Sequence, residues 1–121
     1  MRTLPDTLTP LDLASGTVML DAGNFIVDPD TWTKEFAEHM AKVEGVTLTS
    51  LHWQLINYMR ESLEEHGIMV DARWVIKHLA KIEGITKSEA HKLLYVLFPY
   101  GYVKQACRIA GMRQPRAWST G

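Results

Sequence analysis

Cysteine is almost absent from this 121-residue chain, in which Cys107 is the only one. A single thiol excludes an intramolecular disulfide and a zinc site built from cysteines. The low cysteine content fits a reducing compartment, so we expect a cytoplasmic protein. The chain also lacks any apolar run near the ~18–20 residues that a membrane-spanning helix needs, and its first residues do not follow the basic-then-apolar order of a signal peptide. We therefore expect no membrane association.

Acidic residues are missing from residues 90–121, which contain five Lys and Arg. Residues 1–50, by contrast, contain eight Asp and Glu and three basic residues. The net charge of −1 therefore conceals a basic C-terminal end and an acidic N-terminal half. Such an end predicts an anionic partner, which can be phosphate, sulfite, a nucleic acid or an acidic protein groove. The alternative interpretation is a solvated basic face that the acidic half balances.

Recognisable metal-binding motifs are also lacking. The five histidines form no HExxH motif and no close ligand pair, so we expect no metal and no cofactor. The composition, 46% hydrophobic and 22% charged, is that of a soluble globular protein, and the length predicts one domain over residues 1–121.

Apolar periodicity and capping residues predict a mainly all-α fold. We expect an extended leader over residues 1–15, a β-hairpin over 17–27, a helical bundle over 30–110 and a C-terminal arm over 111–121. Five segments of the bundle, the first capped by Asp30, have apolar residues at helical spacing. Their short connections favour a compact bundle of about five helices that carries the hairpin. The tryptophans on the apolar stripes are expected in the core, namely Trp32, Trp53 and Trp74.

The strongest candidate for chemistry is Cys107, on a short helix expected over residues 102–110. Lys104 lies one helical turn before it, and Arg108 is its sequence neighbour. Nearby cations lower the pKa of a thiol, and the thiolate is the nucleophilic form, so this pattern predicts a reactive cysteine. The competing interpretation is a small buried hydrophobe, because Cys107 falls on the apolar stripe of the helix.

The C-terminal segment carries a sequence signature. It reads Leu97-Phe98-Pro99, then Gly101, then Lys104-Gln105-Ala106-Cys107-Arg108-Ile109-Ala110-Gly111, and then Pro115. Matching positions continue upstream through Gly16-Thr17, Asp21–Phe25, Trp32, Gly45, Leu48, His52-Trp53, Arg60 and Tyr95. This pattern resembles the DsrC/TusE family of small sulfur-relay proteins, which includes the gamma subunit of dissimilatory sulfite reductase. The resemblance implies an orthogonal helical bundle with an N-terminal β-hairpin and a mobile, flexible C-terminal arm.

The chain departs from the family pattern at its second cysteine. DsrC members carry one cysteine inside the KQAC motif and another as the penultimate residue of the arm, whereas TusE members keep only the latter. This chain keeps the internal cysteine as Cys107, while Trp118 stands where the arm cysteine falls and Thr120 is the penultimate residue. Two readings stay open. Either Cys107 carries a persulfide alone, or the protein has kept a docking surface and lost the relay.

The resemblance also implies roles for the basic residues. Lys104 and Arg108 would hold an anion beside the sulfur, and Arg113 and Arg116 would steer the arm into an acidic or anion-bearing cleft. Trp118 would anchor the arm at that interface, as exposed aromatic residues do. The partner would be a sulfite-reductase-like complex or a sulfurtransferase donor of the TusBCD type. The protein would then be a sulfur carrier rather than a turnover enzyme.

Two other functions remain as alternatives. One is a docking or regulatory homologue without sulfur chemistry. The other is a helix-turn-helix DNA-binding regulator, because two expected helices flank a short turn at Gly84. In that case the second helix would face a DNA groove with Lys87, His91, Lys92 and Tyr95. Only two of these side chains are lysines, and short helical connections occur in any small bundle, so this signal is weak.

Overall fold

The computed structural model describes residues 8–114. Its hairpin consists of β1 (Thr9–Leu13) and β2 (Gly16–Leu20), followed by the short 3-10 helix η1 (Pro29–Thr31). The helices are α1 (Lys34–Glu44), α2 (Ser50–His66), α3 (Ala72–Glu83) and α4 (Lys87–Leu97). The last helix has two parts. It begins as the π-helical turn η2 (Tyr102–Ala106) and continues directly into α5 (Cys107–Ile109). The expected mainly α fold with five helices and an N-terminal hairpin is confirmed.

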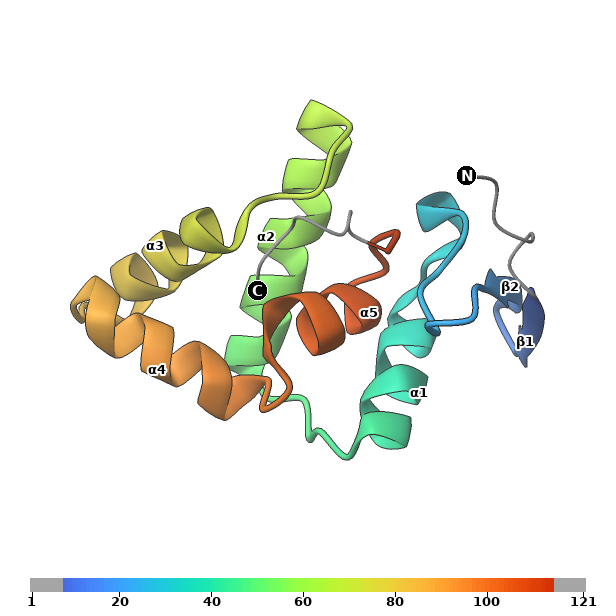
Figure 1. Cartoon of the computed structure of the whole chain (residues 1–121), viewed down its shortest axis with the longest axis horizontal. Coiled ribbons are helices and arrows are strands. Elements are labelled where there is room, and N and C mark those ends of the chain that lie inside the picture. Colours follow the sequence, from blue (N-terminus) through green and yellow to red (C-terminus); the bar gives the residue numbers. More distant parts are fainter. Residues whose placement is uncertain (1–7, 115–121) are drawn as a thin grey trace, which may run out of the picture.

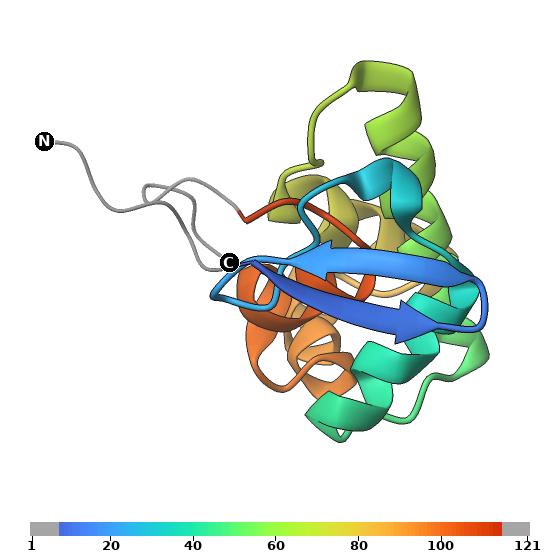
Figure 2. The same cartoon turned by 90° about the vertical axis from the view of Figure 1, so that its right-hand side faces the viewer.

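The C-terminal helix, formed by η2 and α5, lies at the centre of the helices. In Figure 1 the pair α3 and α4 lies on one side of it, and α1 with the hairpin lies on the other. Figure 2, which faces the second side, shows the hairpin lying flat across it. The side chains of the C-terminal helix supply much of the core, including Tyr102, Cys107 and Ile109. Whatever chemistry this segment performs therefore takes place in the middle of the molecule.

Local capping chemistry sets the ends of the helices. Each of α1 to α4 begins after a side chain that accepts a hydrogen bond from the first turn; these N-caps are Thr33, Thr49, Asp71 and Thr86. Gly45, Gly67 and Gly84 end α1, α2 and α3 in the left-handed conformation. The expectation that Asp30 caps the first helix is wrong. Asp28 caps η1 instead, and Trp32 is extended, so α1 starts only after Thr33.

The hairpin lies earlier in the chain than expected. β1 pairs with β2 in antiparallel register from Thr9↔Leu20 to Leu13↔Gly16, so the leader predicted over residues 1–15 contains a strand. The second strand predicted at the end of 17–27 is reduced to one bridge, Leu20↔Ile26. Asp21 closes the turn between the two segments, because its Oδ1 accepts hydrogen bonds from the backbone N–H groups of Gly23 and Phe25. The resulting turn lies at the connection expected from the sequence, and beyond it the backbone N–H of Val27 donates to the carbonyl of Met19 at 3.0 Å.

Glu35 at the start of α1 ties down the hairpin turn. Its carboxylate accepts hydrogen bonds from the backbone N–H of Ala14 (3.1 Å) and of Ser15 (2.8 Å). The side chain and backbone of Ser15 lower the pKa of Glu35 below its ordinary value of 4.5, and the Ala14 N–H acts in the same direction. The turn is therefore held by a charged acceptor that is available at neutral pH.

The hydrogen bonds from Ala14 and Ser15 to the Glu35 carboxylate are expected to depend on pH. A carboxylate with a lowered pKa keeps its hydrogen bonds at every pH above its ordinary value and loses them as the pH falls through the lowered one. The amide proton shifts of Ala14 and Ser15, followed by NMR from pH 7 downwards, should therefore move together with a midpoint below 4.5. Glu35→Gln should abolish the movement. A Glu35→Gln protein that titrates like the native one would contradict the assignment.

The C-terminal arm begins later than residue 111. Gly111 and Met112 are buried, and Arg113 is the first exposed residue after them. The rest of the expected arm, residues 115–121, lies outside the described residues. Between residues 8 and 114, none of the helices is long and apolar enough to cross a membrane.

Candidate functional site

The helix that carries Cys107 starts with a π-helical turn rather than the regular helix expected over 102–110. Pro99 breaks α4, and Gly101 turns the chain with φ 88°, a conformation that favours glycine. The backbone N–H of Cys107 then donates to the carbonyl of Tyr102, five residues back. A turn closed at this spacing brings the side chains of Tyr102 and Cys107 to the same face. Such turns are rare and occur often at functional sites.

The Cys107 side chain is completely buried, with an exposed fraction of 0%. Its Sγ donates to the Sδ of Met69 at 3.4 Å, and the side chain of Tyr102 lies beside it. Burial raises the pKa of the Cys107 thiol to about 12, against a smaller lowering by Tyr102. The prediction that Lys104 and Arg108 lower this pKa is therefore wrong. In this conformation Cys107 is a protonated, buried thiol.

Lys104 and Arg108 lie together on another side of the helix. With Glu44 they line a shallow hollow of about 600 Å³, and Lys104 is exposed there. Arg108 is not a free cation, because its Nη1 lies 3.4 Å from a carboxylate oxygen of Glu44. Its guanidinium also stacks over the ring of Phe25, at 4.9 Å from the ring centre. An anion at this hollow would compete with Glu44 for Arg108.

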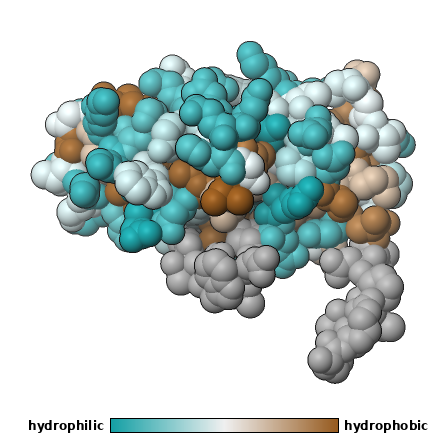
Figure 3. Space-filling model, turned by 90° about the horizontal axis from the view of Figure 1, so that it is seen from above, coloured by the Kyte–Doolittle hydropathy of each residue, from teal (hydrophilic) through white to brown (hydrophobic). Residues whose placement is uncertain are grey.

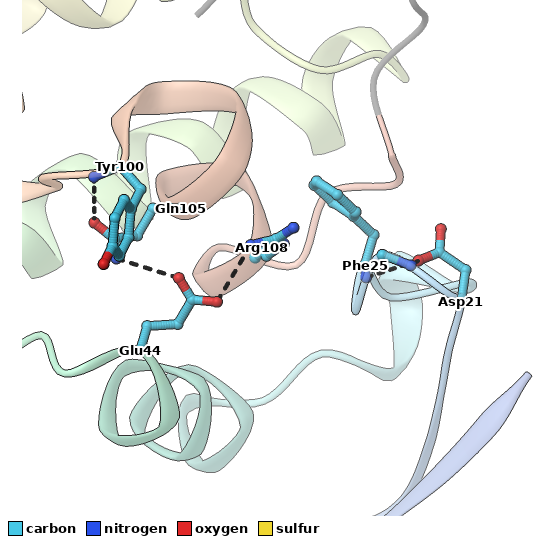
Figure 4. A network of polar contacts seen from close by, with 7 residues as sticks. Asp21, Phe25, Glu44, Tyr100, Gln105 and Arg108 are labelled. Atoms are coloured by element: carbon cyan, nitrogen blue, oxygen red, sulfur yellow. Dashed lines mark hydrogen bonds and ion pairs between the residues drawn. The ribbon is translucent and has the colours of Figure 1, made fainter.

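Glu44 is a residue that the sequence analysis missed. Figure 4 shows its carboxylate reaching from the end of α1 to both Arg108 and Gln105 of the C-terminal helix. Gln105 is itself buried and accepts a hydrogen bond from the backbone N–H of Tyr100. This network satisfies a buried amide and fixes the helix against α1. Its members are 61 and 64 residues apart in sequence, so no spacing rule could have paired them.

Arg60 and Trp32 form a clamp on the end of the C-terminal helix. The Nη1 of Arg60 donates to the carbonyls of Ala110 (3.2 Å) and Gly111 (3.0 Å), and its Nη2 donates to that of Pro29 (2.9 Å). The indole Nε1 of Trp32 donates to the carbonyl of Ile109 at 3.0 Å. The guanidinium of Arg60 lies over the Trp32 ring, 4.6 Å from its centre. The clamp binds the carbonyls that the helix leaves unpaired and fixes the end of the helix.

A groove of about 1400 Å³ lies beside the end of this helix. The end of α2, the loop before α3, η1 and residues 112–114 line it, so Arg113 stands at its edge. Trp74 belongs to the same rim and is 51% exposed, so its expected place in the core is wrong. Figure 3, which views the molecule from above, shows apolar side chains in separate patches among polar ones on that face.

Met69 and Tyr102 connect the groove with the thiol. Both side chains line the groove, and both contact the Sγ of Cys107 on their other side. The hydroxyl of Tyr102 donates to the backbone carbonyl of Val70, which holds the phenol in place. Sequence reasoning missed both residues, because Met69 follows a glycine stop in a loop and the five-residue spacing of Tyr102 lies outside the helical period.

The remaining predicted site residues fall outside this arrangement. Arg116 and Trp118 lie outside the described residues. Among residues 8–114, no group of three or more His, Cys, Asp or Glu side chains is placed to hold a metal ion. The helices of the expected helix-turn-helix pack against each other as α3 and α4. Whether α4 binds DNA stays an untested prediction.

Comparisons with known proteins agree on one family. The family model described as "DsrC like protein" matches residues 13–117. Sulfurtransferase TusE of Pectobacterium atrosepticum is 32% identical over 105 residues, which cover 87% of this chain and 95% of that protein. TusE of Photorhabdus laumondii is 36% identical over 95 residues, covering 78% of this chain and 85% of that protein.

Solved structures give the same result. The solution structure of DsrC from Allochromatium vinosum has a TM-score of 0.77 and 33% identity, and the match covers 92% of this chain and 98% of that one. The oxidized gamma subunit of the dissimilatory sulfite reductase from Archaeoglobus fulgidus has a TM-score of 0.76 and 30% identity, and the match covers 90% of this chain and 98% of that one. The match to the family model covers the second strand of the hairpin, the helices and the segment around Cys107.

Proposed function

Because this chain belongs to the DsrC-like family, we propose that it is a sulfur-relay protein of the DsrC/TusE type that carries sulfur as a persulfide on Cys107. One observation carries the proposal. Cys107 is the only thiol, and it lies on the helix that the family signature covers, one side chain away from a large groove. The protein acts as a carrier that a partner loads and unloads, in the cytoplasm, rather than as a turnover enzyme.

The loading step is an exchange between two sulfur compounds. The thiolate of Cys107 attacks the outer sulfur of a donor persulfide, so that a bond forms between that sulfur and Sγ while the sulfur–sulfur bond of the donor breaks. The donor leaves as a thiolate and takes up the proton that Cys107 gives up. The transferred sulfur keeps its oxidation state, so the step needs no oxidant or reductant. Cys107 must first become a thiolate, which the closed, buried position disfavours because the pKa there is about 12.

The partner follows from the names of the relatives. One is the gamma subunit of a dissimilatory sulfite reductase, and others are sulfurtransferases called TusE. We infer that this chain docks on a sulfite-reductase-like complex or on a sulfurtransferase donor. Arg113 lies at the edge of the groove, and Arg116 and Trp118 follow it in sequence, so these three residues remain the proposed docking arm. Lys104 is exposed in the separate hollow beside Glu44 and would be a second point of contact, whereas Arg108 is paired with Glu44 there.

A second candidate function is docking or regulation without sulfur chemistry. The observation that favours it is the complete burial of Cys107, together with the missing arm cysteine. Such a protein would keep the family's body and compete with a sulfur-carrying relative for the same partner. The two functions differ in one property, which is whether Cys107 of the folded protein takes up sulfur.

That property is directly measurable by intact mass spectrometry after incubation with a persulfide donor. A carrier is expected to gain the mass of one sulfur atom in the native protein, and Cys107→Ser is expected to gain none. Reduction of the loaded protein should restore the original mass, since a persulfide is reducible. If the native protein gains no sulfur while a denatured sample reacts, the docking function replaces the carrier function.

A further inference from the structure

The thiol of Cys107 and the large groove share a thin wall. The wall consists of two side chains, Met69 and Tyr102, each of which lines the groove and contacts Sγ. The Sδ of Met69 lies 3.4 Å from Sγ, so no third side chain fits between them. The groove is therefore one side chain away from Sγ, and a sulfur compound could approach Cys107 from it.

The two parts of this wall differ in how easily they can move. Tyr102 belongs to the π-helical turn, is buried, and is held by its hydrogen bond to the carbonyl of Val70. Met69 is only partly buried and lies in the loop between α2 and α3, after the left-handed Gly67 and next to Ile68, which is 70% exposed. An unbranched thioether side chain has three rotatable bonds and changes rotamer at small cost. Met69 can therefore leave the wall while the backbone and Tyr102 stay in place.

We propose that Met69 is the gate of Cys107: its side chain swings away from Sγ, and the persulfide of the donor then reaches Cys107 from the groove. This inference rests on the proposed function, for which it supplies the route of the sulfur. Tyr102 is the fixed side of the gate. Its hydroxyl remains beside Sγ and can turn its hydrogen from Val70 to the sulfur when the thiolate forms.

The test measures how fast a small thiol reagent such as iodoacetamide labels Cys107 in the folded, full-length protein. Met69→Ala removes the movable part of the wall, and labelling is expected to become at least about tenfold faster because the open form is more populated. Met69→Leu keeps a side chain of similar volume at position 69, so its labelling rate should stay close to the native one. Ile68→Ala is the matched control, since Ile68 lines the same groove and its side chain is 70% exposed, and the labelling rate should not change. A larger maleimide reagent should gain less from Met69→Ala than iodoacetamide does, because the opening is one side chain wide.

Global unfolding must be separated from opening of the gate. Low concentrations of urea accelerate labelling through unfolding but hardly affect a local opening, which exposes little surface. Labelling of Met69→Ala should therefore depend weakly on urea. If Met69→Ala does not fold, Met69→Val provides the same comparison with a smaller opening. The gate is refuted if the folded variant labels at the native rate, or if Ile68→Ala accelerates labelling as much.

The gate and the proposed function fail in different ways, because alkylation does not involve a sulfur donor. Faster alkylation of Met69→Ala without any sulfur uptake by the native protein would support the gate and refute the carrier function. Sulfur uptake by the native protein at a rate that Met69→Ala leaves unchanged would support the carrier function and refute the gate.

Discussion

Replacing Gly111 by alanine is expected to lower the free energy of unfolding by about 3–5 kcal/mol. Gly111 has φ 76°, where any residue with a Cβ loses about 1–2 kcal/mol. A Cβ would also lie 2.3 Å from Cδ1 and 2.7 Å from Cγ of Trp32, and 2.9 Å from Nη1 of Arg60. The Trp32 ring would have to move, and its hydrogen bond to Ile109 and its stacking on Arg60 would be lost. The measurement is urea denaturation.

Gly45→Ala is the matched control for this prediction. Gly45 has nearly the same backbone angle, φ 77°, but apart from its chain neighbours no atom of residues 8–114 crowds the position that its Cβ would take. This variant should therefore lose only about 1–2 kcal/mol, the cost of the left-handed backbone. The difference between the two variants then measures the contact with the clamp. Equal losses would show that the approach of Trp32 to Gly111 contributes nothing.

The second large effect is expected at His52, the buried histidine that links α2 to the end of α4. Its Nδ1 accepts from the backbone N–H of Thr49 at 3.0 Å, which assigns the ring proton to Nε2. That Nε2–H donates to the carbonyl of Leu97 at 2.7 Å. His52→Ala should cost about 3 kcal/mol, because it removes part of a helix cap and leaves a buried carbonyl without a donor. The ring also packs edge-on against Phe98, so a cavity adds to the loss.

The control for His52 is another histidine on the same helix. His66 is exposed in the last turn of α2, so His66→Ala should change the free energy of unfolding by less than about 0.5 kcal/mol. Thermal and urea unfolding of both variants give the comparison. A loss below about 1 kcal/mol for His52→Ala would mean that water replaces the histidine at both of its partners.

The helices were predictable because their ends depend on neighbouring residues. Thr49, Asp71 and Thr86 cap from within the first turn, and glycines that stop a helix act at one position. β1 was missed because its strand is partly exposed and contains Pro10, which an edge strand tolerates. The turn at Asp21 was predicted from its turn-forming residues, whereas β-propensity did not show that the segment after it would pair through a single bridge.

The candidate site was predictable only in part. The apolar stripe indicated correctly that Cys107 could be buried, yet sequence neighbours were wrongly taken as spatial neighbours of its sulfur. Lys104 and Arg108 face the hollow with Glu44, and the thiol faces Met69. The π-helical turn causes this arrangement, since it rotates residues away from the positions that a period of 3.6 assigns. Tertiary contacts such as that of Met69 with Cys107, 38 residues apart, leave no local signal.

Complete burial of the thiol has a further consequence for a sulfur carrier. A persulfide in open solution is short-lived, since any dissolved thiol can strip its outer sulfur by exchange. Sulfur held behind Met69 would be shielded from that reaction, because a reductant has to wait for the same opening that admits the donor. The same opening of Met69 would then limit both the rate of loading and the rate at which the persulfide loses its outer sulfur. The persulfide would be protected between partners by burial, without a second cysteine to form a disulfide with it.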